Sequence, residues 1–215
     1  IQNLIERLNW LGIGRIASVC GRFYGLNRDK NWDRTHKAYQ LITEGLGEPA
    51  SDFPTAIKKQ YSQGVTDEFI EPIVFQENGQ TPGILKDNDV LIFFDFREDS
   101  VRQLAESFFL TDFKEFTTKK LKNLFAATLT EYEPNLSAEV IFPAPELKYS
   151  LAQILSRSGK KQFRIAETEK YAHVTYFFNG GEEQPTPGET RKLIHSLPSI
   201  RFDATPAMKV VEIGE

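Results

Sequence analysis

The residues of this sequence best suited to chemistry are arginines that follow strand-like segments. Arg22 and Arg28 lie in a polar loop after the segment Arg15–Cys20, and Arg97 follows the apolar segment Val90–Phe96. A guanidinium presents a planar fork of N–H donors that pairs with a phosphate or carboxylate through two hydrogen bonds. Ligands of open α/β sheets commonly bind beyond the carboxyl ends of the strands. This placement predicts a site for a small anion.

A lysine in a second polar segment would add a positive charge to such a site. Lys170 lies in the connector between two strand-like runs, Gln162–Ile165 and Val174–Phe178, and Asn179-Gly180-Gly181 ends the second run. Loops at strand ends often carry binding and catalytic groups. The alternative is a surface lysine in a solvated turn, and composition alone favours this alternative.

Structural roles are also open for the arginines, because acidic neighbours in the sequence could form ion pairs with them. These neighbours are Asp29 and Asp33 for Arg28, and Glu98 and Asp99 for Arg97. The three histidines, His36, His173 and His195, are far apart in the sequence and lack the spacing of metal ligands. The residues alone therefore leave two alternatives, an anion site and a set of structural ion pairs.

The elements that would position these residues alternate between strands and helices. Strands are expected at Arg15–Cys20, Ile73–Gln76, Thr81–Leu85, Val90–Phe96, Leu124–Thr130, Gln162–Ile165, Val174–Phe178 and Ile200–Phe202. Helices are expected over residues 1–11, 35–46, 53–63, 97–109 and 146–158. Asn78-Gly79 predicts a β-hairpin, and the apolar run Val90–Phe96 predicts a central strand covered on both faces. The expected fold class is α/β, with a mixed, mostly parallel central sheet flanked by helices and one β-hairpin.

The composition of the chain limits which binding partners and which cellular compartment we expect for the protein. The net charge of −4 over 215 residues argues against nucleic acid or an anionic membrane as the main partner. The densest basic run, Lys119–Lys122, is interpreted as a solvated helix face. The single cysteine excludes an internal disulfide, and no apolar run approaches the ~20 residues that span a bilayer. We therefore expect a cytoplasmic protein.

Three longer motifs occur in an order that is typical of one known family. Residues 18–34 read Ser-Val-Cys-Gly-Arg-Phe-Tyr-Gly-Leu-Asn-Arg-Asp-Lys-Asn-Trp-Asp-Arg, residues 87–97 read Asp-Asn-Asp-Val-Leu-Ile-Phe-Phe-Asp-Phe-Arg, and residues 166–181 read Ala-Glu-Thr-Glu-Lys-Tyr-Ala-His-Val-Thr-Tyr-Phe-Phe-Asn-Gly-Gly. They resemble motifs of the cofactor-independent (2,3-bisphosphoglycerate-independent) phosphoglycerate mutases, and the similarity covers nearly the whole chain. Because Ile1 already lies within a helical pattern and is not a methionine, we interpret the chain as a piece of a longer protein.

The resemblance implies roles for individual residues. Arg22, Arg28 and Arg97 match the family arginines that hold the phosphate and carboxylate of phosphoglycerate. Lys170 matches the catalytic lysine, which also binds substrate and reaches toward the phosphoryl group during transfer.

The sequence also departs from the family pattern. Ser100 replaces the second arginine of the motif Asn-Phe-Arg-x-x-Arg, and Asp95 replaces its asparagine. The loss of one charge-assisted hydrogen bond costs about 1.5–3 kcal/mol. Arg102 could compensate in part, although its place on a helix directs it elsewhere than Ser100. Cys20 stands where the family has a small polar residue, and we interpret it as a packing residue.

The resemblance further implies a larger enzyme. The family interconverts 3-phosphoglycerate and 2-phosphoglycerate in glycolysis through a phosphoserine intermediate, without 2,3-bisphosphoglycerate as a cofactor. Its serine nucleophile and two manganese ions lie on a phosphatase-like domain, and this sequence shows no such ligand cluster. Residues 1–215 are therefore expected to form a single substrate-binding (transferase) domain. We expect a monomer that is inactive without the missing metal-bearing domain of the same protein.

Two other hypotheses remain open at this point. The chain could be a stand-alone or degenerate phospho-ligand-binding or regulatory module derived from that domain, and Ser100 and Asp95 would be early signs of the change. It could also belong to a related metal-dependent phosphomutase that acts on another phosphate ester. The Gly-Arg-Phe-Tyr and Glu-Lys-Tyr motifs argue against the second hypothesis.

Overall fold

The structure is a computed structural model that describes residues 1–143, 147, 149–197 and 205–215. The chain divides into two units, Ile1–Ala144 and Pro145–Glu215, which are described separately. The sequence predicted a single substrate-binding domain over residues 1–215. The functional grouping of both units in one domain stays a prediction.

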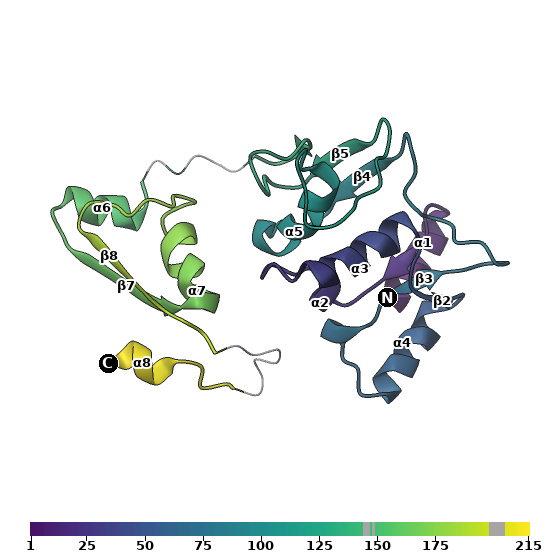
Figure 1. The fold of residues 1–215 in the computed structure, drawn as a ribbon, viewed down its shortest axis with the longest axis horizontal. Coiled ribbons are helices and arrows are strands. Elements are labelled where there is room, and N and C mark those ends of the chain that lie inside the picture. Colours follow the sequence, from purple (N-terminus) through teal and green to yellow (C-terminus); the bar gives the residue numbers. More distant parts are fainter. Residues whose placement is uncertain (144–146, 148, 198–204) are drawn as a thin grey trace. The chain divides into compact units, whose positions relative to one another are not determined.

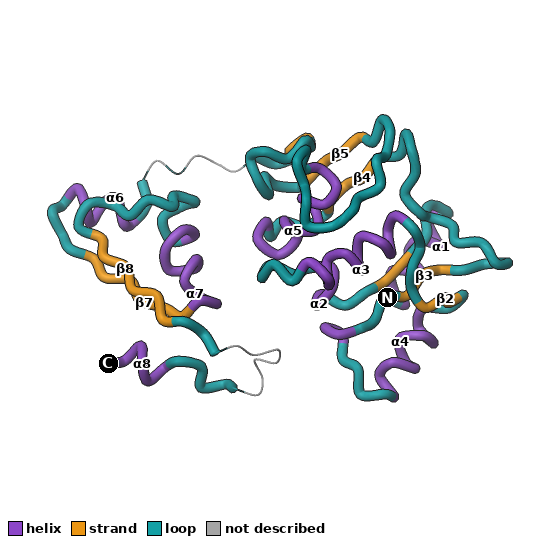
Figure 2. The backbone as a smooth tube through the Cα atoms, in the orientation of Figure 1, coloured by secondary structure: helices purple, strands orange, loops and turns teal. Residues whose placement is uncertain are grey.

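The first unit combines helices with two small sheets (Figures 1 and 2). Its helices are α1 (Gln2–Leu11), α2 (Arg22–Gly25), α3 (Trp32–Thr43), α4 (Phe53–Ser62) and α5 (Glu98–Phe109), with the 3-10 turn η1 (Asp67–Phe69). Its strands are β1 (Ser18–Val19), β2 (Glu48–Ala50), β3 (Ile73–Phe75), β4 (Val90–Phe93), β5 (Phe125–Thr128) and β6 (Glu139–Val140). One sheet has the order β1-β3-β2, in which only the β1–β3 pair is antiparallel, and the other is the parallel sheet β4-β5-β6.

The core of the first unit fixes where α5 begins. Tyr39 of α3, Phe93 of β4 and Ala105 of α5 belong to one cluster of buried residues. The buried Tyr132 hydroxyl donates to the carbonyl oxygen of Asp95 at 2.6 Å, and thereby holds the segment between β4 and α5. The residues that follow β4 are therefore held against a packed core.

The second unit is built on two parallel strands. They are β7 (Gln162–Glu167) and β8 (Glu189–Ile194), which pair in register from Gln162↔Glu189 to Glu167↔Ile194 (Figure 1). Its helices are α6 (Leu151–Arg157), α7 (Thr168–Ala172) and α8 (Val210–Gly214), and α7 continues into the π-helical turn η2 (His173–Phe177). None of the described helices in either unit is long and apolar enough to cross a lipid bilayer.

The α/β class with mostly parallel strand pairs is confirmed, and so are several element boundaries. Asp52 caps α4 by accepting a hydrogen bond from the Thr55 amide at 3.0 Å. The hairpin turn at Asn78 and Gly79 is present with φ angles of 51° and 75°, but a single bridge closes it. In place of the expected central sheet, the described residues form three smaller sheets.

The segment Val174–Phe178 is not a strand, contrary to the sequence prediction. It continues the helical path of α7, in which the Thr175 hydroxyl donates to the Tyr171 carbonyl at 2.7 Å. β-propensity reflects packing on a sheet surface, and here tertiary context outweighs it. The predicted end of this segment is correct, because Gly180 and Gly181 adopt positive φ angles that favour glycine.

Two further sequence predictions are changed by the structure in the second unit. The sequence analysis predicted no strand at the position of β8, and the strand predicted at Ile200–Phe202 lies outside the described residues. Helix α6 begins at Leu151 instead of Glu146, after a capping box formed by Ser150 and Gln153. Its predicted apolar face is largely exposed, since Leu151 and Ile154 face solvent while Ala152 is buried.

The strand β4 is an edge strand of its sheet, and the prediction of a central strand covered on both faces is wrong. Val90, Ile92 and Phe94 alternate on an exposed face, and Phe94 is 85% exposed. Phe93 points to the opposite, buried face. Because both faces carry apolar residues, the sequence run hid this alternation.

Candidate functional site

The end of β4 and the start of α5 carry the best-defined cluster of charged residues in the first unit. Arg97 precedes the first residue of α5, and its backbone N–H donates to Asp95 Oδ1 at 2.8 Å. The Arg97 side chain donates through Nε to Asp99 Oδ1 at 2.6 Å and through Nη2 to Asp99 Oδ2 at 3.0 Å. This is the two-pronged pairing that a guanidinium makes with a carboxylate.

A second arginine joins the same carboxylate. Arg28, in the loop between α2 and α3, donates from Nη1 to Asp99 Oδ2 at 2.8 Å. Burial of the Asp99 side chain opposes its ionisation, but hydrogen bonds and charges from Arg97 and Arg28 outweigh this and lower its pKa. Asp99 therefore stays ionised and holds two guanidiniums together.

The arrangement leaves part of the pair accessible to a ligand. The Arg97 side chain is 57% exposed, whereas the Asp99 side chain is only 18% exposed. The hydrogen bond to Asp99 raises the pKa of Arg97, so its charge is fixed. A guanidinium has five N–H donors, and Arg97 uses two of them on Asp99. Because the side chain is more than half exposed, an anion could accept hydrogen bonds from the remaining donors.

Arg22 lies on α2, within a segment that the sequence had interpreted as a loop. Its Nη2 forms an ion pair with Glu68 at 3.1 Å, and its side chain is exposed. The preceding Gly21 is required by close packing, because an added Cβ would lie 2.2 Å from the Glu68 carbonyl oxygen. The close packing of Gly21 therefore fixes the backbone position from which the Arg22 side chain extends. Its described contact is with Glu68, not with the Asp99 cluster.

Asp95 and Ser100, which depart from the family pattern, both form hydrogen bonds to the backbone of Arg97. Asp95 supplies a side-chain oxygen for the Arg97 amide, a role that an asparagine oxygen could also fill. The Ser100 hydroxyl donates to the Arg97 carbonyl at 3.1 Å. Arg102 donates from Nε to the Tyr132 carbonyl at 2.6 Å and lies near Glu98 and Glu133. Arg102 therefore does not take the place of the missing arginine.

Lys170 belongs to the second unit and lies on α7, not in a loop between strands. Its side chain is exposed. Among the residues that the structure describes, it has no hydrogen-bond or ion-pair partner. An unneutralised ammonium on a helix is suited to meet an anionic ligand as a point charge.

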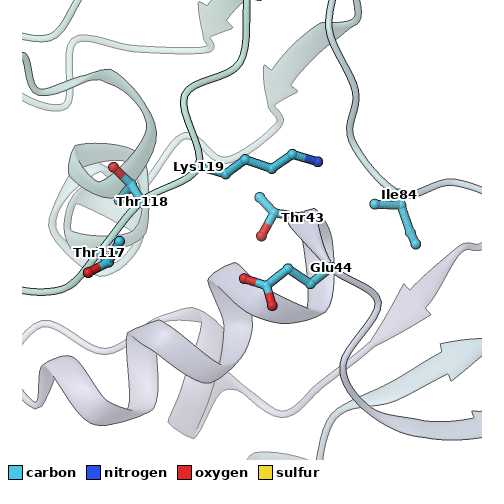
Figure 3. Close-up of a pocket in the computed structure, with 6 residues that line it drawn as sticks. All are labelled: Thr43, Glu44, Ile84, Thr117, Thr118 and Lys119. Atoms are coloured by element: carbon cyan, nitrogen blue, oxygen red, sulfur yellow. The ribbon is translucent and has the colours of Figure 1, made fainter.

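A pocket of about 500 Å³ lies elsewhere in the first unit (Figure 3). Thr43, Glu44, Ile84, Thr117, Thr118 and Lys119 line it. None of the four predicted site residues is among them. Lys119, from the densest basic run, donates its backbone N–H to the Tyr39 hydroxyl at 2.7 Å, which ties this loop to α3.

The remaining candidate groups have packing roles. Burial raises the pKa of the Cys20 thiol to about 11, so it stays protonated and unreactive at neutral pH. His36 stacks on Phe116 with ring centroids 4.4 Å apart. In the described parts of the chain, no group of three or more His, Cys, Asp or Glu side chains could hold a metal ion.

The residue that sequence reasoning underestimated is Asp99. It was considered only as a local partner of Arg97, and its bond to Arg28 joins positions 71 residues apart. The available signal was weak, since an acid two residues after an arginine is common on helix surfaces. The pairing became visible only with the packing of α3 against α5.

The fold and the cluster define a class of protein, an α/β protein that holds two arginines on one carboxylate near the end of a strand. The chain belongs to the family described as BPG-independent PGAM N-terminus (iPGM_N), whose model matches residues 1–134. That match lies entirely within the first unit.

Comparisons over the whole chain point to the same family. The chain is 45% identical over 215 residues to the 2,3-bisphosphoglycerate-independent phosphoglycerate mutase of Synechococcus sp. strain JA-3-3Ab, covering 99% of this chain and 39% of the relative. It is 45% identical over 213 residues to that of Methanococcoides burtonii, covering 98% and 41%. A crystal structure of Leishmania mexicana phosphoglycerate mutase at low cobalt concentration matches with a TM-score of 0.79 and 25% identity, covering 98% of this chain and 40% of that one. The chain thus spans about two fifths of the length of these relatives.

Proposed function

We propose that this chain is the substrate-binding part of a cofactor-independent phosphoglycerate mutase. The whole enzyme would be an isomerase of glycolysis that interconverts 3-phosphoglycerate and 2-phosphoglycerate through a phosphoserine intermediate. The observation that carries the proposal is the pair Arg28 and Arg97, joined on Asp99 with the Arg97 guanidinium exposed. Their fork geometry suits the phosphate or the carboxylate of phosphoglycerate.

Each site residue has a proposed task. Arg97 and Arg28 bind and orient one anionic group of the substrate, and Arg22 adds a further guanidinium from α2. Lys170 acts as the catalytic lysine, whose ammonium stabilises negative charge on the phosphoryl group during transfer. Asp99 does not bind substrate, but it orients the two arginines.

The metal chemistry lies outside this part of the protein. The described residues do not fit a manganese site, so we assign the two manganese ions and the serine nucleophile to the portion of the protein that relatives have in addition. Bound manganese would supply charge stabilisation to the phosphoryl group there. We propose that the chain is cytoplasmic and monomeric, works with that metal-bearing portion, and needs neither 2,3-bisphosphoglycerate nor nucleic acid.

Calorimetric titration of the chain with 3-phosphoglycerate tests the proposal. We expect weak binding that Arg97→Ala and Arg28→Ala each weaken about tenfold or more, since a charge-assisted hydrogen bond contributes about 1.5–3 kcal/mol. Arg15→Ala is the matched control, because Arg15 is an exposed arginine of the same unit with a loose ion pair to Glu77 at 3.7 Å. Equal effects of Arg15→Ala and Arg97→Ala would reject a specific site. Metal-stimulated mutase activity of the pure chain would contradict its expected inactivity.

A second candidate is a degenerate phospho-ligand-binding module, which the position of Ser100 favours. The Ser100 hydroxyl donates to the Arg97 carbonyl, so this position makes a local hydrogen bond and supplies no guanidinium to the site. Ser100→Arg distinguishes the two functions. If affinity for 3-phosphoglycerate rises tenfold or more in this variant, a weakened site is the better description of the natural chain.

A further inference from the structure

One serine from the second unit contacts three consecutive residues that precede Lys170. The Ser196 hydroxyl donates to Glu167 Oε2 at 3.0 Å and accepts the Glu169 backbone N–H at 3.3 Å. The Ser196 backbone N–H donates to Thr168 Oγ1 at 3.2 Å. Ser196 follows β8, so these three bonds tie the start of α7 to the end of a neighbouring strand. We call them the Ser196 clasp.

The clasp satisfies groups that the helix itself leaves open. The first N–H groups of a helix have no partner within it. Glu167 precedes the first residue of α7, but its side chain makes no capping bond to the helix. The hydroxyl of Ser196 takes that role for Glu169 from a distant point of the chain.

Glu167 is the buried end of the clasp. It is 5% exposed, and its two carboxylate oxygens accept from the Ser196 hydroxyl and from the Lys209 backbone N–H at 3.2 Å. A buried carboxylate is costly unless its hydrogen bonds are made. The donor bond to Glu167 also orients the Ser196 hydroxyl, so its lone pairs face the Glu169 amide.

We infer that Ser196 is a positioning residue for Lys170, a role that rests on the proposed function of this lysine. Lys170 lies on α7 with an exposed side chain, so the backbone of α7 sets the point from which its ammonium is presented. That backbone belongs to a five-residue helix whose first turn is held by the clasp. Loss of the Ser196 hydroxyl would loosen the first turn of α7. The Lys170 ammonium would then be displaced from the position in which it binds the ligand.

Amide hydrogen exchange in the 215-residue chain tests the clasp without any ligand. We expect Ser196→Ala to accelerate exchange at residues 168–170 about tenfold, because Glu169 loses its acceptor. Ser196→Thr keeps the hydroxyl and should restore slow exchange. Ser158→Ala is the matched control, since the Ser158 hydroxyl donates to the Ile154 carbonyl at 2.9 Å on α6 of the same unit. Exchange at 168–170 that is the same in Ser196→Ala and Ser158→Ala would overturn the inference.

A double-mutant cycle with 3-phosphoglycerate separates positioning from a merely structural role. Ser196→Ala should weaken binding about fivefold in the natural background and less than twofold in the Lys170→Ala background. Equal effects in both backgrounds would make Ser196 a structural residue only and would overturn the inference. If amide exchange is faster in Ser196→Ala but Lys170→Ala does not change 3-phosphoglycerate binding, the proposed role of Lys170 is rejected instead. If the natural chain does not bind 3-phosphoglycerate, the exchange comparison alone decides whether the clasp holds α7.

Discussion

Each unit contains an ion pair between an arginine and an acid two positions apart in the sequence, and the two pairs have opposite environments. Arg97 and Asp99 lie at the start of α5, where the arginine side chain is 57% exposed. Glu189 and Arg191 lie on β8, where the arginine side chain is 12% exposed and the glutamate side chain is fully buried. Both arginines donate through Nε to the acid at 2.6–2.7 Å. Pairing with an acid therefore does not distinguish the two arginines, whereas side-chain exposure does.

The second pair is built into a buried network of hydrogen bonds. The Glu189 carboxylate also accepts hydrogen bonds from the Asn179 amide and from the backbone and hydroxyl of Thr186. Arg191 Nη1 donates to the Glu183 carbonyl at 2.7 Å. The network ties β8 to the turn that ends η2 and to the loop before β8. We interpret it as a structural centre of the second unit.

Removal of this buried ion pair should have the largest effect on stability. Arg191→Ala leaves the Glu189 charge buried without its cation, which should lower the stability of the second unit by about 3 kcal/mol. Both tryptophans lie in the first unit, so fluorescence would not report this change. Amide exchange along β7 and β8 reports it directly. An unchanged exchange rate in Arg191→Ala would contradict the structural role.

Acid should weaken the same network. Burial of Glu189 opposes its ionisation, but hydrogen bonds from Arg191, Thr186 and Asn179 outweigh this and lower its pKa to about 2. A depressed pKa contributes stability that is present above the unfolded-state value near pH 4.3 and is lost as pH falls toward 2. We expect a loss on the order of 2 kcal/mol between pH 5 and pH 2, again read from β7–β8 exchange corrected for intrinsic rates. Glu189→Gln should be less stable at pH 7 and should lack most of this dependence.

A smaller effect is expected from Asp99→Ala in the first unit. The variant leaves two arginines close together without a carboxylate, but both retain access to solvent, so the cost should be about 1 kcal/mol. Urea unfolding followed by Trp32 fluorescence measures it, because α3 packs against α5. Asp112→Ala, at an exposed aspartate of the same unit, is the control. If Asp99→Ala lowered the free energy of unfolding as much as Arg191→Ala does, the contrast between the two ion pairs would be contradicted.

The smallest stability effect should come from Arg97→Ala. An exposed ion pair contributes about 0–1 kcal/mol, so the variant should unfold within about 0.5 kcal/mol of the natural chain. Its affinity for 3-phosphoglycerate should nevertheless fall about tenfold or more. A destabilisation above 2 kcal/mol would indicate that Arg97 is a structural residue like Arg191.

The sequence was sufficient for the features that depend on local chemistry. The helices expected over residues 53–63 and 97–109 and the place of Arg97 after a strand followed from residue types and spacing. The four candidate residues were identified, but the sequence could not distinguish Arg97 from Arg191, because both stand two residues from an acid.

The features that sequence reasoning missed depend on tertiary contacts. The residues Val174–Phe178 have strand-like types, but in the helical path they contact Arg164 of β7, which donates from Nη1 to the Val174 carbonyl and lies over the Phe178 ring. The apolar run at β4 gives no sign that one face is open. The bonds of Asp99 to Arg28 and of Ser196 to Glu167 join residues that are far apart in sequence, so no local pattern contains them.

The most direct test is a ¹H–¹⁵N spectrum of the arginine Nε–H groups during titration with 3-phosphoglycerate, with Arg97→Lys and Arg191→Lys used for assignment. We predict that the Arg97 signal shifts in a saturable manner while the Arg191 signal, from a buried structural pair, stays in place. A shift of Arg191 without a shift of Arg97 would contradict the claim that the exposed arginine held by Asp99 binds the substrate anion.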